Sequence, residues 1–125
     1  MSLPQENDEI AHLQVEQIDG LVAAAGVDGT RSILDAFWRS TTELLETLKD
    51  QVGQETLDLA AQTAHAVKGS AANVGAQRLA AAAFQVEDAC RTGEKAAIDA
   101  ALNAVLEDFE AVRECFEDHL SKAAS

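Results

Sequence analysis

The stretch QETLDLAAQTAHAVKGSAANVG, residues 54–75, decides the fold class of this chain. Small and apolar side chains recur in it at spacings of three and four, which places them on one face of a helix. These positions are Leu57, Ala60, Ala64, Val67, Ala71 and Val74. Gly75 follows directly and is the expected stop, because glycine readily adopts the left-handed conformation that ends many helices.

Three further stretches repeat this pattern, over residues 27–53, 76–93 and 94–120, with short glycine-containing breaks between them. Their expected core positions are Leu34, Phe37, Thr41, Leu44, Leu48 and Val52, then Leu79, Ala83, Val86 and Cys90, then Ile98, Leu102, Val105, Phe109, Val112 and Phe116. Short connections make neighbouring helices antiparallel. We therefore expect an all-α fold, an antiparallel up-down-up-down four-helix bundle.

A weaker helical pattern over residues 8–26 precedes the bundle, with Gly20 as a candidate interruption. It predicts an additional short N-terminal helical segment that ends near Gly26 and packs across one end or side of the bundle. Trp38 is expected to pack under this segment. The length of 125 residues predicts a single domain, 1–125, with the N-terminal residues 1–8 poorly ordered.

The composition excludes several classes of function. Apolar residues make up 47% of the chain, with one proline and no tyrosine, which favours helices over strands. The net charge of −13 opposes binding to nucleic acid, and no polybasic stretch is present for an anionic membrane. No apolar run approaches the ~20 residues of a membrane span, and the N-terminus lacks a signal peptide's apolar region. We expect a cytoplasmic protein with no nucleic-acid or membrane partner.

His65, Lys68 and Gly69 share the outer surface of their helix. At ~100° per residue, His65 lies roughly 130° from the centre of the apolar face, and Gly69 lies one turn further along. Glycine costs about 1 kcal/mol relative to alanine in a helix interior, and access by a partner's backbone is a good reason to keep it. A neutral imidazole is a competent nucleophile near pH 7, and a neighbouring ammonium would offset the charge of an accepted phosphoryl group.

Two other interpretations stay open. His65 and Lys68 can lie together by chance, on a bundle that docks proteins without phosphotransfer. A helical bundle can also hold a di-metal site, which needs Glu-x-x-His on two facing helices and two further glutamates. Glu9 and His12 match once, but His119 fails to supply a second copy, so a metal-binding bundle is less favoured and no metal ligands are expected. The residues expected to be scattered surface charges are Arg39, Lys49, Arg78 and Arg91.

The motif that begins at His65 resembles the signature of histidine-containing phosphotransfer (HPt) domains. The pattern H-x-x-K-G-S-x-x-x-x-G is matched from His65 to Gly75, and Leu79 follows. The resemblance covers most of residues 15–118. It implies a four-helix bundle that relays phosphoryl groups between aspartates of response-regulator receiver domains.

The resemblance also implies roles for individual residues. His65 would be the phosphoacceptor, through Nε2, and Lys68 would stabilise the phosphohistidine. Glu87 lies where the family often has an acid or amide that faces the histidine helix. The positions with an implied structural role are Ser70, Gly75, Gln77 and Glu87, and Ala76 would complete the turn between Gly75 and Gln77. The positions implied to dock the partner are Gly69, which leaves room for the receiver, with Ala61, Gln62, Ala72 and Asn73 around it.

The partners implied by the resemblance are response-regulator receiver domains, a hybrid histidine kinase, or both. The family's Mg²⁺ and catalytic acids belong to the receiver, so no cofactor is expected on this chain. No glycine-rich ATP-binding motif is present, so no kinase activity of its own is expected. We further expect a monomer, and the Met start with short tails favours a free-standing protein over the excised end of a hybrid kinase.

Overall fold

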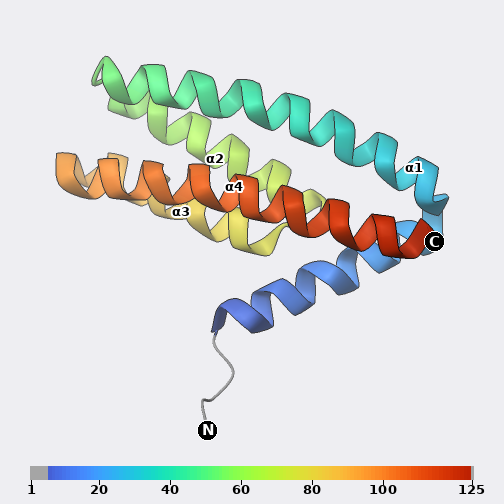
Figure 1. Cartoon of the computed structure of the whole chain (residues 1–125). Coiled ribbons are helices and arrows are strands. Elements are labelled where there is room, and N and C mark those ends of the chain that lie inside the picture. The colour runs from blue at the N-terminus through green and yellow to red at the C-terminus, as the bar shows by residue number, and fades with distance from the viewer. Residues whose placement is uncertain (1–5, 125) are drawn as a thin grey trace, which may run out of the picture.

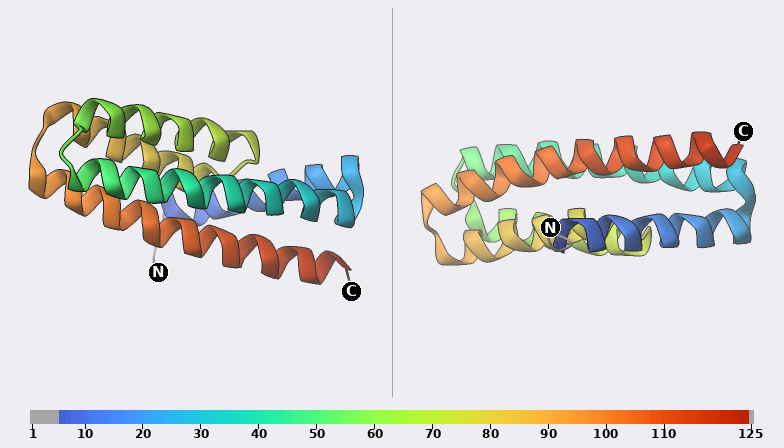
Figure 2. Two further views of the ribbon diagram at one scale, coloured as in Figure 1. Left: turned by 90° about the horizontal axis from the view of Figure 1, so that it is seen from above. Right: turned by 60° about the horizontal axis from the view of Figure 1, so that its bottom comes forward.

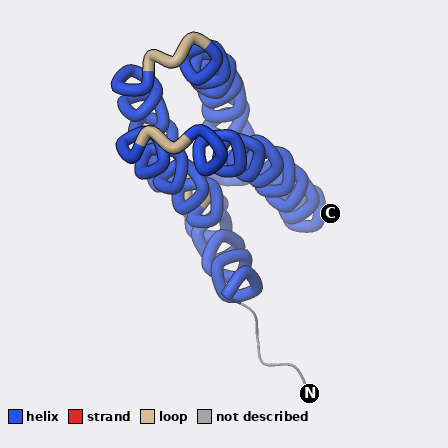
Figure 3. The backbone as a smooth tube through the Cα atoms, turned by 90° about the vertical axis from the view of Figure 1, so that its left-hand side faces the viewer, coloured by secondary structure: helices blue, strands red, loops and turns tan. Residues whose placement is uncertain are grey.

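The computed structural model describes the backbone of residues 6–124 and the side chains of residues 16–122. Its helices are α1 (Glu6–Gly53), α2 (Leu57–Asn73), α3 (Gln77–Thr92) and α4 (Lys95–Ala124), and no strand occurs among the described residues (Figure 1). The short α1–α2 and α3–α4 connections lie together at one end of the bundle, as the end-on view shows (Figure 3). The expected all-α antiparallel bundle is confirmed.

α1 bends sharply at Gly26, whose φ of 76° and ψ of 172° are not helical. Glycine adopts this positive φ without the steric cost that a Cβ would bring. The N-terminal half of α1 runs back from the bend alongside the bundle, which confirms the additional helical segment (Figure 2). Gly20 does not interrupt it. Of residues 1–8, residues 1–5 lie outside the described part, and residues 6–8 form the start of α1.

The core follows the periodic positions expected from the sequence. Most of them are buried, and the largest fully buried side chains include Phe116, Leu34, Leu48 and Leu79. The expected core positions that are only partly buried are Leu44, Val52, Leu57 and Leu102. The helical period of 3.6 residues therefore accounts for which side chains face inward.

Trp38 is buried against α4. Its ring lies edge-on to Phe109 of α4 at a centroid distance of 5.8 Å and is 5.9 Å from Phe116. Edge-on contacts at such distances are favourable between aromatic rings. Trp38 therefore packs between α1 and α4, and its packing under the N-terminal half of α1 stays a prediction.

α2 and α3, which pack against each other, bury many small side chains. The buried alanines on the two helices are Ala60, Ala61, Ala64 and Ala71 of α2 and Ala82, Ala83 and Ala89 of α3. The distance between packed helices depends on the side chains at their contact, so alanines allow a close approach. A residue on the outer edge of α2 can therefore reach a side chain on α3.

The turn between α2 and α3 requires glycine at Gly75. Its φ is 76°, and a Cβ added to it would collide with the side chain of Gln17 in the N-terminal half of α1. Val74 and Ala76 on either side are buried, and so is Ile18 next to Gln17. The N-terminal half of α1 therefore covers this turn closely.

We expect Gly75→Ala to destabilise the protein more than Gly93→Ala does. Gly93 has nearly the same φ, 77°, but open space where the Cβ would go, so it is a matched control. Backbone strain at a positive φ costs on the order of 1–3 kcal/mol at either position, and only Gly75→Ala adds the collision with Gln17. Denaturant unfolding measures both free energies. Equal losses would show that Gln17 moves aside at no cost.

Candidate functional site

His65 projects outward from the middle of α2. Ala64 and Val67 on the apolar face of α2 are buried. The His65 side chain points away from that face and is 64% exposed. Its Nδ1 lies 3.2 Å from Oε1 of Glu87 on α3. One nitrogen of the ring is therefore held by the neighbouring helix while the ring itself faces solvent.

Glu87 is the buried centre of this site. Its side chain is only 8% exposed, and its second oxygen, Oε2, accepts a hydrogen bond from Nη2 of Arg91 at 2.7 Å. Burial alone would raise the pKa of Glu87, but hydrogen bonds from His65 and Arg91 and the charges of these groups lower the pKa below its ordinary value. Glu87 is therefore a carboxylate at neutral pH.

The ionised Glu87 fixes the tautomer of the neutral imidazole. A carboxylate can only accept hydrogen bonds, so Nδ1 of His65 must donate. In a neutral ring the proton on Nδ1 leaves the lone pair on Nε2. The nitrogen that points away from Glu87 is thus the one able to act as a nucleophile.

Lys68 places a positive charge beside the imidazole. Its Nζ lies 4.0 Å from Oε1 of Glu87 and 5.2 Å from the centre of the Phe84 ring on α3. Glu87 therefore has His65, Lys68 and Arg91 around one carboxylate. An anionic group on Nε2 would find the Lys68 ammonium on the same edge of the α2–α3 pair.

Gly69 occupies open space one turn beyond His65. A Cβ added there would meet no atom within 4 Å, so the packing of the bundle does not require glycine at this position. Ala72, three residues further along α2, is exposed, so neither Gly69 nor Ala72 places a long side chain beside the imidazole. Neither packing nor a positive φ therefore accounts for a glycine that costs helix stability.

The other residues expected to dock a partner differ in their exposure to solvent. Gln62 and Asn73 are exposed on α2, as docking residues must be. Ala61 is only 6% exposed and belongs to the core, so the expectation that it lines the docking surface is wrong. It lies close enough to the apolar face of α2 to be covered by the neighbouring helix.

The sequence model of the Hpt domain family matches residues 32–115, well over half of the chain. The chain belongs to the Hpt domain family. Hpt domains act in histidine phosphotransfer in two-component systems, with receiver domains and histidine kinases. His65, Lys68, Gly69 and Glu87 of this Hpt domain all lie inside the matched region.

A solved structure also resembles this Hpt domain. It is an X-ray structure of a rice protein named "putative histidine-containing phosphotransfer protein", with a TM-score of 0.73 and 22% sequence identity. The match covers 92% of this chain and 91% of the rice chain, and it shows that the two share a fold. None of the curated proteins compared with the chain matches it.

The remaining motif residues lie in or near the turn that closes α2 onto α3. The backbone N–H of Gly75 donates to the carbonyl of Ala72 at 3.1 Å, and Gln77 begins α3 directly after Ala76. Ser70 is half-buried on α2. The turn expected at residues 75–77 is therefore present.

The contacts of two residues of the site, Arg91 and Phe84, were not predicted from the sequence. Arg91 was expected to be a scattered surface charge, which is wrong, because it is hydrogen-bonded to Glu87. A signal was available, since an Arg four residues after a Glu lies one turn along the same helix face. Phe84, which carries the contact with Lys68, lies three residues before Glu87 on the same helix.

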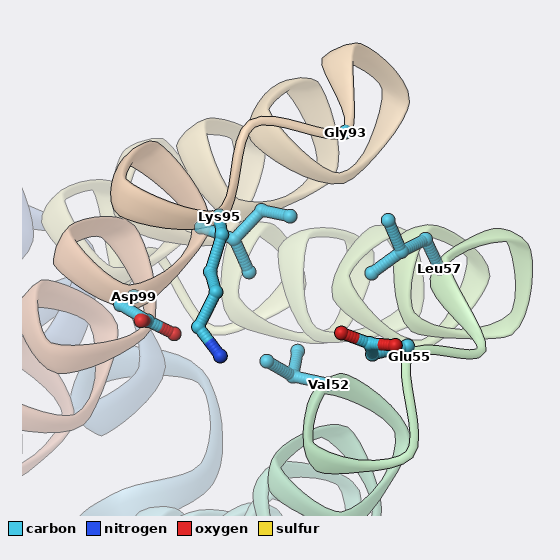
Figure 4. Close-up of a pocket in the computed structure, with 7 residues that line it drawn as sticks. Val52, Glu55, Leu57, Gly93, Lys95 and Asp99 are labelled. Atoms are coloured by element: carbon cyan, nitrogen blue, oxygen red, sulfur yellow. The ribbon is translucent and has the colours of Figure 1, made fainter.

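A hollow lies at the end of the bundle far from the α2–α3 turn, and it does not contain the residues of this site. Its lining residues are Val52, Glu55, Leu57, Gly93, Lys95, Ile98 and Asp99, where α1 ends and α4 begins (Figure 4). None of the motif residues from His65 to Gly75 is among them. With the His65 side chain 64% exposed, the candidate site of this Hpt domain lies on an exposed helix face.

No group of three His, Cys, Asp or Glu residues within the described part of the chain is placed to hold a metal ion. The side chains of Glu9 and His12 lie outside the described residues. No helix in this described region is both long and apolar enough to cross a membrane.

Proposed function

We propose that this Hpt domain is a phosphorelay intermediate. His65 accepts a phosphoryl group at Nε2 from the aspartyl phosphate of one receiver domain and passes it to the aspartate of another. The observation that carries the proposal is the hydrogen bond between Nδ1 of His65 and the buried Glu87 carboxylate. It leaves the lone pair on the exposed nitrogen, where a second protein has access.

The transfer step does not require the imidazole ring to lose a proton. The Nε2 lone pair attacks phosphorus, the N–P bond forms, and the bond from phosphorus to the aspartate oxygen breaks. The aspartate leaves as a carboxylate with the electron pair. The phosphorylated ring keeps its proton on Nδ1 and so gains positive character, which the Glu87 carboxylate opposite it stabilises.

In this proposal Lys68 compensates the charge of the phosphoryl group, and Gly69 gives the receiver access to His65. The Lys68 ammonium offsets the charge of about −1.5 to −2 that a phosphoryl group brings. Gly69 and Ala72 leave the surface beside His65 low enough for a receiver to bring its reacting aspartate close. Mg²⁺ is supplied by the receiver and not by this chain.

The proposed setting is the cytoplasm, with the chain acting as a monomer between receiver domains, one of which can belong to a hybrid histidine kinase. A bundle that only docks proteins would not need a histidine held by a buried carboxylate and flanked by a lysine. That arrangement favours the relay over the docking alternative.

The test is transfer of label from a phosphorylated receiver. Receiver domains carrying ³²P on aspartate are mixed with the chain, and the time course of label on each protein is followed. We expect label to move to this chain with at least one receiver, and the bond formed to be labile in acid and stable in base, as a phosphoramidate is. Label that survives acid would contradict the proposal, as would a chain that no receiver labels.

A further inference from the structure

Phe84 is a large apolar side chain left in solvent at the edge of the site. It lies on α3, it is 46% exposed, and its ring faces the Lys68 ammonium at 5.2 Å from Nζ to the ring centre. A cation within about 6 Å of an aromatic ring is attracted by the ring's negative face. The exposed ring therefore has a polar partner, and that partner is the cation beside His65.

The position of Lys68 shows what this contact does. A close ion pair between an ammonium and a carboxylate has a distance of about 2.7–2.9 Å, whereas Nζ of Lys68 lies 4.0 Å from Oε1 of Glu87. Glu87 already accepts hydrogen bonds from His65 and Arg91. The ammonium thus lies over the ring and makes no close ion pair with the carboxylate, so its N–H donors remain available.

We propose that Phe84 is a positioning residue that holds the Lys68 ammonium beside His65, in reach of a phosphoryl group on Nε2. This inference rests on the proposed function and adds the residue that controls its cation. A free lysine side chain has many rotamers and loses rotamer entropy when it is fixed. The ring reduces that loss because it restricts the ammonium to the site before the phosphoryl group arrives.

The test uses a small phosphodonor, phosphoramidate, so that docking of a receiver plays no part. The lifetime of the phosphohistidine is compared between the wild type, Phe84→Leu and Phe84→Tyr. Leucine keeps an apolar side chain without a ring, and tyrosine restores the ring. We expect the lifetime to shorten about two- to five-fold in Phe84→Leu, the factor to which a cation–π contact at an exposed site corresponds, and to recover in Phe84→Tyr.

A double-mutant cycle shows whether Phe84 affects the phosphohistidine lifetime through Lys68. Lys68→Ala should shorten the lifetime, and adding Phe84→Leu to Lys68→Ala should change nothing further, because the ring acts only through the ammonium. Leu59→Ala is the control for loss of an exposed apolar side chain on α2, since Leu59 is 50% exposed, and it should leave the lifetime unchanged. An undiminished effect of Phe84→Leu in the Lys68→Ala background would overturn the inference.

A second readout does not depend on phosphorylation. A ring over the ammonium shifts the NMR signals of the neighbouring Lys68 methylene protons upfield, and this shift should disappear in Phe84→Leu and return in Phe84→Tyr. If the wild type takes phosphate on His65 and Phe84→Leu has the same lifetime, the inference fails and the proposed function stands. If the wild type takes no phosphate from any donor, both fail.

Discussion

Replacing His65 by glutamine is expected to abolish phosphorylation of this chain while leaving its fold unchanged. The label transferred from a phosphorylated receiver should fall below detection, because no other nitrogen occupies the position of Nε2. Stability should change little, since the His65 side chain is 64% exposed and buries little apolar area. The glutamine amide can also donate to Glu87 in place of Nδ1, so the buried carboxylate keeps a donor.

His119→Gln is the matched control for this substitution. His119 also has a carboxylate partner, with Nε2 2.6 Å from Oδ1 of Asp19, but it lies on α4 without the lysine and glycine neighbours of His65. The variant should accept label like the wild type. Label that persists in His65→Gln, or that is lost in His119→Gln, would move the phosphoacceptor away from His65.

Gly69→Arg is expected to separate phosphotransfer from stability. The long side chain would project from α2, one helical turn after His65, into the space that a receiver must occupy. Transfer depends on close positioning of the reacting atoms, and a small misplacement can slow it on the order of 100-fold. Stability should be equal or up to about 1 kcal/mol higher, because a Cβ at this position meets no atom within 4 Å and glycine is a poor helix former.

The measurement is the ratio of two rates in the same variant, transfer from a receiver and phosphorylation by phosphoramidate. The ratio should fall steeply in Gly69→Arg and stay near the wild-type value in Gly69→Ala, whose methyl group is too small to keep a receiver away. Equal slowing of both rates would mean that the glycine serves the geometry of the histidine. No slowing of either rate would show that the receiver does not approach over this face.

The helices could be predicted from the sequence because each buries one face at the helical period. The spacing from Leu57 to Val74 predicts α2, and Gly26 marks the bend in α1, since glycine is free to adopt the φ required there. The place of Trp38 could not be predicted in the same way. A side chain next to the core seam can turn towards either neighbouring helix, and the packing of α4 decides which.

The candidate site was predictable where one helix carries it and not where two helices meet. His65, Lys68 and Gly69 follow from spacing along α2, and Glu87 came from the family resemblance. The Arg91–Glu87 pair lies within α3 and follows from the four-residue spacing. The contact of Phe84 with Lys68 depends instead on how closely α3 approaches α2. The burial of Ala61 has the same origin, because a small residue at the edge of an apolar face is covered only if the neighbour comes close.

The fold-back of α1 at Gly26 makes the folded unit longer than the region that matches the Hpt family. The region that matches the family is residues 32–115, yet Ile18 before it and Phe116 and Leu120 after it are completely buried. A fragment trimmed to the matched region would lose these side chains from its core and uncover the turn at Gly75. Segments outside the region that matches the family therefore help to hold the helices that carry His65 in place.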